Sequence, residues 1–178
     1  MHSAVKEGDT VVLENLMRNY SDIATGGWIV YGWTLFSRAI EKGIFRLTKI
    51  VLAAGGDPHV DINTISGGRT PLIWSVRNNG VRSTKLLLSA GADVNLGDFE
   101  DVTPLTYACR QLCHVEIFRA LLVKGASLNT GQDGWSQLFF VVYRYLNQSC
   151  VAKLDLLLRF GADEKMENRY GQTPLQFL

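Results

Sequence analysis

Short apolar segments alternate with polar, glycine-containing segments along most of the chain, and the apolar segments have helical spacing. Leucine-rich stretches at residues 86–88, 121–122 and 156–158 are each followed by a glycine three residues on. Glycine enters the left-handed conformation that ends a helix at little cost, so each stretch predicts the last turns of a helix. Before two of these stretches, Leu72 with Val76 and Leu105 with Cys109 each fall on one helical face. The pattern predicts repeated pairs of short amphipathic helices.

Two motifs recur along the chain at a nearly constant distance. The segment Gly-Arg-Thr-Pro-Leu at residues 68–72 returns 33 residues later as Asp-Val-Thr-Pro-Leu at residues 101–105. It returns in weaker form at residues 134–138 and again at residues 171–175. The string at residues 86–93 matches residues 120–127 and 156–163 and, more loosely, residues 50–57. A unit of this period cannot bury its apolar face alone, so neighbouring units are expected to stack into one elongated core.

These motifs resemble the ankyrin-repeat family, whose pattern joins a Thr-Pro-Leu turn, two helices and a Gly-Ala-Asp-Val-Asn exit such as residues 91–95. The resemblance implies an all-α solenoid of ankyrin repeats, in which helix-turn-helix pairs alternate with β-turn fingers. We expect a single ankyrin-repeat domain over residues 1–178 with about five and a half units. The units are placed at residues 1–28, 29–64, 65–97, 98–130 and 131–167, with a partial unit at residues 168–178. The partial unit stops inside its first helix, so we expect either that the natural chain continues past Leu178 or that these residues form a short cap.

Composition narrows the classes of partner. With 178 residues, of which 47% are hydrophobic and 20% charged, the chain can bury a core of its own. The formal net charge of +1 gives no overall field for nucleic acid or for an anionic membrane, and no apolar run approaches the ~20 residues that span a bilayer. We therefore expect neither a nucleic-acid nor a membrane partner. Three cysteines and an N-terminus without a secretion signal favour free thiols and a cytoplasmic or nuclear location.

The family resemblance implies that partners contact the finger tips and the exposed side of each first helix. Mapped onto this chain, the candidate partner-binding residues are Tyr31, Trp33, Arg69, Arg77, Asn78, Phe99, Arg110, Gln111, Trp135, Tyr143, Arg144 and Tyr170. Arg77 and Arg110 recur at 33 residues and form a predicted arginine ladder, which suits an acidic segment with spaced carboxylates or phosphates.

A purely structural role for these residues is the alternative. Trp33 and Trp135 would then cover the neighbouring finger, and the two ladder arginines would bridge to carboxylates one unit away. Three further aromatic residues recur at the same spacing beside core positions, and we expect them to pack there: Trp74, Tyr107 and Phe140.

No group of residues in the sequence predicts chemistry. Cys109, Cys113 and His114 are close in sequence, but no second cluster completes a set of metal ligands, so we expect the cysteines to pack in the core. No glycine-rich segment has the form of a phosphate-binding loop. We therefore expect no enzyme activity, no catalytic residue, no metal and no cofactor. The resemblance also implies that Asn95 is a candidate for hydroxylation by an oxygen-dependent hydroxylase; the alternative is that it hydrogen-bonds the finger turn.

The leading functional interpretation is a non-catalytic, monomeric protein–protein interaction module. It would bind a peptide or a folded domain of another protein along its fingers and concave surface, and it could be the recognition part of a larger scaffold or ubiquitin-ligase adaptor. The alternatives are a targeting or regulatory domain of an enzyme, or a host-directed effector. Nucleic-acid binding is disfavoured by the near-neutral charge.

Overall fold

The computed structural model describes residues 29–30, 33–34, 40, 43–53, 68–110, 113–128, 135–143 and 148–177. The elements within these ranges are β1 (Ile29–Val30), β2 (Trp33–Thr34), α4 (Phe45–Ala53), α5 (Pro71–Arg77), α6 (Val81–Ser89), α7 (Pro104–Arg110), α8 (Val115–Val123), α9 (Gln137–Tyr143), α10 (Gln148–Arg159) and the 3-10 helix η3 (Pro174–Phe177). The predicted first unit, residues 1–28, lies outside the described residues, so the number of units stays a prediction.

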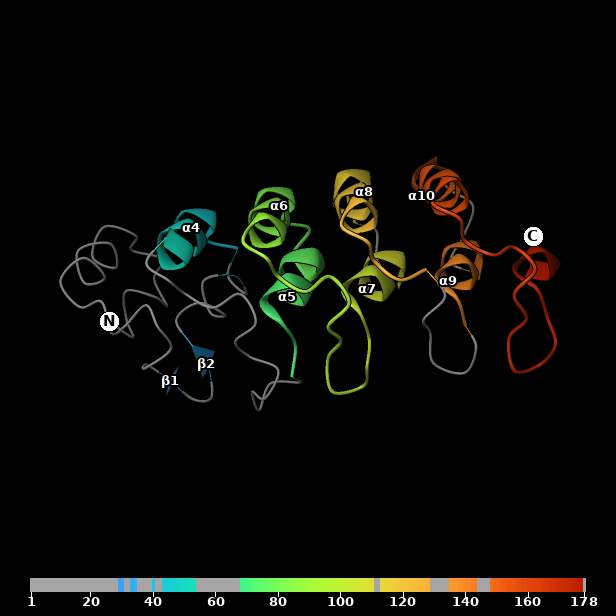
Figure 1. Ribbon diagram of the computed structural model, residues 1–178, viewed down its shortest axis with the longest axis horizontal. Coiled ribbons are helices and arrows are strands. Elements are labelled where there is room, and N and C mark those ends of the chain that lie inside the picture. Colours follow the sequence, from blue (N-terminus) through green and yellow to red (C-terminus); the bar gives the residue numbers. More distant parts are fainter. Residues whose placement is uncertain are drawn as a thin grey trace.

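The helices form two parallel rows, as the predicted solenoid requires (Figure 1). The second helices of the pairs, α4, α6, α8 and α10, form one row, in which each packs on the next. The first helices α5, α7 and α9 form the other row, which η3 continues. Long loops project on the far side of the first helices, and β1 pairs antiparallel with β2 on that side as well. The prediction of an all-α ankyrin solenoid with fingers is confirmed.

The first helices begin where the Thr-Pro-Leu motif predicts. Thr70 precedes α5 with an extended backbone, and its hydroxyl accepts a hydrogen bond from the backbone N–H of Ile73 at 3.2 Å. Thr103 accepts in the same way from the N–H of Thr106 at 3.3 Å. A capping bond of this kind satisfies an N–H that has no partner inside the helix. Ser136, at the same position before α9, is buried, and its hydroxyl has no partner within the described residues.

The second helices end at the predicted glycines. Gly91, Gly125 and Gly161 have φ angles of +92°, +83° and +89°, in the left-handed region that a side chain disfavours. After α6, the N–H of Ala92 reaches back to the carbonyl of Leu87 at 3.0 Å, and the same bond recurs after α8 and α10. The chain therefore leaves each second helix in the same direction, toward the next finger.

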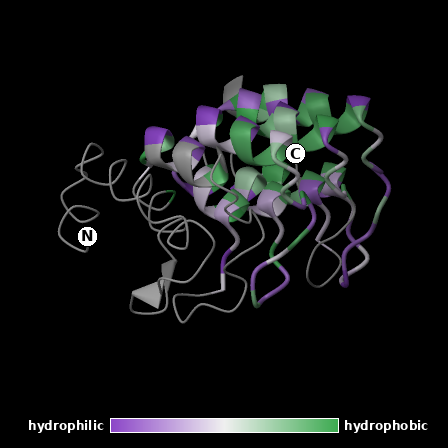
Figure 2. Cartoon of the chain, turned by 60° about the vertical axis from the view of Figure 1, so that its left-hand side comes forward, coloured by the Kyte–Doolittle hydropathy of each residue, from purple (hydrophilic) through white to green (hydrophobic). Residues whose placement is uncertain are grey.

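One buried leucine per unit lines the elongated core. Leu87, Leu121 and Leu157 occupy the same repeat position, and each is 0% exposed. Hydrophobic residues gather in the two layers of helices (Figure 2). None of the described helices combines the length and apolar character that crossing a bilayer requires.

The prediction that α10 buries its leucines as the earlier second helices do is wrong for Leu158. This side chain is 43% exposed, whereas Leu88 and Leu122 at the same position are 4% exposed. The physical reason is that α8 packs on α6 and α10 packs on α8, whereas no second helix packs on the far side of α10 in the described part of the chain. Leu175 is also exposed, as the incomplete last unit predicts.

Candidate interaction surface

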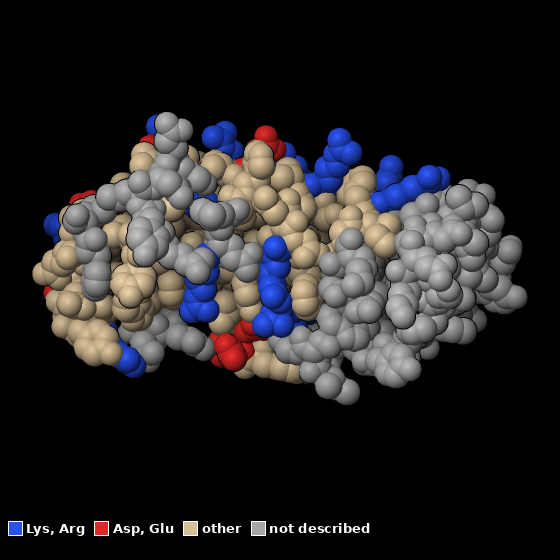
Figure 3. All heavy atoms as spheres, turned by 180° about the vertical axis from the view of Figure 1, so that it is seen from behind, with Lys and Arg blue, Asp and Glu red and all other residues tan. Residues whose placement is uncertain are grey.

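Three repeat positions of the first helices define one surface, called here the first-helix face. The first position immediately precedes the capping residue, the second is the fourth residue of the helix, and the third is its last residue. The residues at these positions are Arg69, Trp74 and Arg77 around α5, Val102, Tyr107 and Arg110 around α7, and Trp135, Phe140 and Tyr143 around α9. Seen from behind, basic side chains form two columns in the middle of the molecule (Figure 3).

Two arginines converge on the aromatic rings at the step from α5 to α7. The guanidinium carbon of Arg77 lies 4.7 Å from the ring centroid of Trp74 and 5.9 Å from that of Tyr107. The guanidinium carbon of Arg69 lies 5.6 Å and 5.8 Å from the same two centroids. Both arginines are half-buried. Contacts of this kind are cation–π interactions, which attract a cation and leave its charge in place.

Tyr107 is held in this position by hydrogen bonds on both sides of its hydroxyl. The hydroxyl accepts a bond from Arg69 Nε at 2.9 Å and donates one to Asp98 Oδ2 at 2.7 Å. Burial, reinforced by the bond to Asp98, raises the pKa of Tyr107, so the hydroxyl stays protonated and keeps donating. Asp98 also accepts from the backbone N–H groups of Glu100 and Val102, each at 3.0 Å, and is 7% exposed. The carboxylate thus shapes the finger and fixes the ring.

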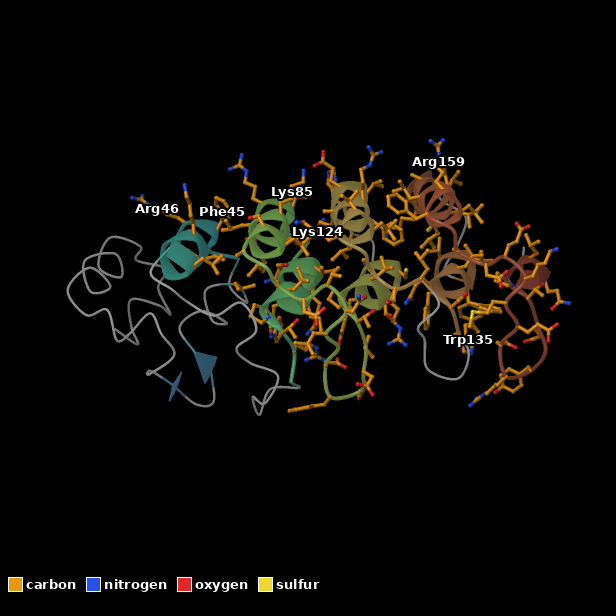
Figure 4. The ribbon with its side chains drawn as sticks, in the orientation of Figure 1. Phe45, Arg46, Lys85, Lys124, Trp135 and Arg159 are labelled. Carbon is orange, nitrogen blue, oxygen red and sulfur yellow. The ribbon has the colours of Figure 1, made fainter. Side chains whose placement is uncertain are left out.

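The step from α7 to α9 carries one arginine and more aromatic area. The guanidinium carbon of Arg110 lies 4.6 Å from the ring centroid of Phe140, in the next unit. The ring of Trp135 packs against Phe139, Phe140 and Tyr143, with centroid distances of 5.2, 6.1 and 5.7 Å. Trp135 therefore covers its own helix α9 instead of a neighbouring finger (Figure 4). Along the face, positive charge decreases and aromatic area increases from α5 to α9.

The ladder arginines make ring contacts where bridges to carboxylates were the alternative. Within the described ranges, ion pairs join Lys85 to Glu116 and Arg159 to Asp155, all four on second helices. The Lys85 ammonium holds the pKa of Glu116 below its ordinary value. Lys85 and Arg159 lie on the outer edge of the second helices, away from the fingers (Figure 4). A role of Arg77 and Arg110 in partner binding stays a prediction.

The described finger residues combine exposure with local packing. Phe99 is 59% exposed, and its ring lies so close to Gly68 that a Cβ added there would collide with it. Gly68 has a φ of +56°, so glycine suits both the backbone and the close contact. Tyr170 is 61% exposed, and the guanidinium carbon of Arg169 lies 4.8 Å from its ring centroid. Both aromatic residues present area to solvent at the finger side.

The remaining candidates are only partly placed. Asn78 is exposed, and its side-chain N–H donates to the carbonyl of Ile40 at 2.7 Å, which links α5 to the preceding unit. Trp33 lies in β2, opposite Val30. Three candidates lie outside the described residues: Tyr31, Gln111 and Arg144.

Asn95, the candidate for hydroxylation, connects two units. Its side-chain oxygen accepts from the N–H of Ser127 at 2.8 Å, and its side-chain N–H donates to the carbonyl of Gly125 at 3.2 Å. The asparagine therefore has a structural role of the kind that was the alternative, and its partners belong to the next unit instead of its own turn. Hydroxylation of Asn95 stays a prediction.

The cysteines are packed inside the solenoid. Cys109, Cys113 and Cys150 are buried, free thiols. Burial raises the pKa of both Cys109 and Cys113, although the nearby Lys153 ammonium opposes this shift. A raised pKa keeps a thiol protonated and unreactive. In the described part of the chain, no three His, Cys, Asp or Glu side chains gather as metal ligands would.

A buried lysine is the feature that sequence reasoning missed. Lys153 on α10 is 2% exposed; its Nζ donates to the carbonyl of Ala108 at 2.8 Å and lies 5.6 Å from the ring centroid of Phe118. The repeat register could have found it, because the same position holds Ser83 and Ile117, which are both buried. Lys153 connects α10 to the last turn of α7, so its role is to hold adjacent units together.

Stacked helix pairs with exposed arginine and aromatic positions on one row form a repeat module for protein–protein interaction. The family model described as ankyrin repeats (three copies) matches residues 1–98 and 37–132, and the chain belongs to the ankyrin-repeat family. Ankyrin repeats typically serve as non-catalytic interaction modules.

Two curated relatives are similar to this chain. The transient receptor potential channel pyrexia of Drosophila melanogaster is 31% identical over 137 residues, which is 77% of this chain and 13% of the channel. The human transient receptor potential cation channel subfamily A member 1 is 31% identical over 108 residues, which is 61% of this chain and 9% of the channel. The chain thus spans only about a tenth of the length of either relative, and the similarity does not extend to a whole channel.

Proposed function

We propose that the first-helix face binds an extended segment of another protein, with acidic side chains over α5 and α7 and apolar side chains over α9. The observation that supports this proposal is the graded composition of the three repeat positions. Two arginines surround Trp74, one lies against Phe140, and around α9 the same positions hold only aromatic residues. A segment of matching polarity would bind in one direction only.

The arrangement suits binding for a second reason. Arginine and aromatic side chains supply much of the energy of protein interfaces because they bury large flat areas. An arginine already stacked on a ring has lost part of its rotamer freedom before the partner arrives, so less entropy is lost on binding. The guanidinium groups of Arg77 and Arg110 are both held in this way.

Charge reversal on the two faces tests the proposal. The test variant is Arg77→Glu with Arg110→Glu, and the matched control is Arg82→Glu with Arg119→Glu, on exposed positions of α6 and α8. Both variants change the net charge equally. We expect partners captured by the wild-type chain to be retained by the control and lost from the test variant, with both variants melting near the wild-type temperature. Retention of every partner by the folded test variant would show that the surface is wrongly assigned.

The wider role of the module is part of the proposal. We infer that it recognises a partner on behalf of a larger assembly, as a scaffold or a ubiquitin-ligase adaptor would; enzyme targeting and a host-directed effector role are the alternatives. A partner captured on the first-helix face distinguishes them by its fate, since an adaptor predicts ubiquitin on the partner in cells and a scaffold does not. The monomeric state and the cytoplasmic or nuclear location also stay predictions.

A further inference from the structure

The step between α5 and α7 differs from the next step by one extra cation. Arg69 and Arg77 lie on either side of Trp74 in the sequence, and both guanidinium groups lie within reach of the same ring of Tyr107, at 5.8 and 5.9 Å. At the next step, the position of Arg69 is taken by Val102, so only Arg110 remains. The density of positive charge on the first-helix face is therefore highest at this one place.

The chemistry around the pair leaves this charge available to a ligand. Asp98 reaches the pair through the Tyr107 hydroxyl, but both of its carboxylate oxygens already accept hydrogen bonds, from Tyr107 and from two backbone N–H groups. The rings of Trp74 and Tyr107 hold the guanidinium groups through their faces, and a stacked guanidinium keeps its N–H donors at the edge of its plane. Two edges with two positive charges thus lie on one exposed step.

We propose that this step binds a phosphorylated side chain of the partner segment. A phosphoryl group carries about −1.5 to −2 charges near neutral pH and three strong acceptor oxygens, so it can accept bonds from two arginines at once. A carboxylate carries one charge and is satisfied by a single arginine through two parallel bonds. The double arginine therefore favours phosphate over carboxylate. The inference rests on the proposed function, because it names the group that the acidic end of the segment presents.

The direct test uses small probes on the intact chain. Isotope-labelled protein is titrated with O-phospho-L-serine and separately with L-glutamate at equal ionic strength, and the indole N–H signal of Trp74, assigned with Trp74→Phe, is followed by NMR. We expect a saturable shift with phosphoserine and at least about ten-fold weaker binding of glutamate. Arg77→Gln should abolish the phosphoserine response, while Arg110→Gln, one unit along, should keep it. Equal binding of the two probes, or an unchanged response in Arg77→Gln, overturns the inference.

The pH dependence gives a second readout. The second ionisation of a phosphoryl group has a pKa of about 6, so its charge falls as the pH is lowered through that value. Phosphoserine binding should therefore weaken between about pH 7 and pH 5, where glutamate keeps its single charge. Phosphoserine affinity that does not fall over this range would contradict recognition of a doubly charged group.

Phosphatase treatment separates failure of this inference from failure of the proposed function. Partners are captured before and after dephosphorylation, by the wild-type chain and by the variant with Arg77→Glu and Arg110→Glu. Loss of capture after both treatments supports the inference. Capture that survives phosphatase and is lost with the charge reversal leaves the surface assignment in place and refutes the phosphate. Capture that survives the charge reversal refutes the proposed function itself.

Discussion

Replacing Leu122 by alanine should destabilise the solenoid far more than replacing Leu158, although the two leucines occupy the same repeat position. Leu122 is 4% exposed beneath the next second helix, and Leu158 is 43% exposed. Truncating a buried leucine removes the transfer energy of its side chain and leaves a cavity, which together cost about 2–5 kcal/mol. At Leu158 only about half of the transfer term is lost and solvent fills the space, so we expect a cost of about 1 kcal/mol.

The assay is urea unfolding followed by the circular dichroism of the helices. Leu88→Ala gives an internal replicate, since Leu88 is also 4% exposed and should lower the midpoint as Leu122→Ala does. Equal m-values among the variants would show that the same surface unfolds in each. Equal losses at Leu122 and Leu158, or a larger loss at Leu158, would refute the reasoning that each second helix is buried by the one that follows it.

Three further predictions concern the caps and the thiols. Thr70→Ala should cost about 1 kcal/mol because it removes a capping bond, whereas Ser136→Ala should change stability little, since that buried hydroxyl has no partner in the described structure; urea midpoints decide this, and equal costs would contradict it. Gly125→Ala should cost about 1–2 kcal/mol for the left-handed backbone alone, because the space around its Cβ is open; an unchanged melting temperature would contradict it. Cys109 and Cys113 should resist alkylation at mildly alkaline pH until urea unfolds the chain, because their raised pKa keeps the thiolate, the reactive form, scarce; rapid labelling of the native protein would contradict it.

Much of the fold could be predicted because the repeat fixes equivalent environments. Once residues 68–72 and 101–105 are recognised as one motif, the caps at Thr70 and Thr103 and the buried Leu87 and Leu121 follow from their positions alone. The same reasoning fails where a unit lacks its neighbour. Leu158 has the identity and position of a core residue, but its burial depends on a helix that would have to pack against α10.

The candidate surface could be predicted in outline and not in detail. The sequence identifies Arg77 and Arg110 as equivalent residues one unit apart, because equivalence needs only the register. It does not show that each guanidinium lies over a ring, since that depends on side-chain rotamers and on the spacing between units. The pairing of Arg69 with Arg77 escaped notice for the same reason: the two belong to different repeat positions and meet only around Trp74 and Tyr107.

Site-specific photo-crosslinking tests the central claim, that a partner lies on the first-helix face, most directly. A photoreactive phenylalanine is placed either at Tyr143, on first helix α9, or at Val123, on second helix α8, which are 65% and 66% exposed. The equal exposure makes the two positions a matched pair. We predict that the captured partner crosslinks from position 143 and not from position 123. Crosslinking from position 123 alone, or equally from both, would contradict the assignment of the binding surface.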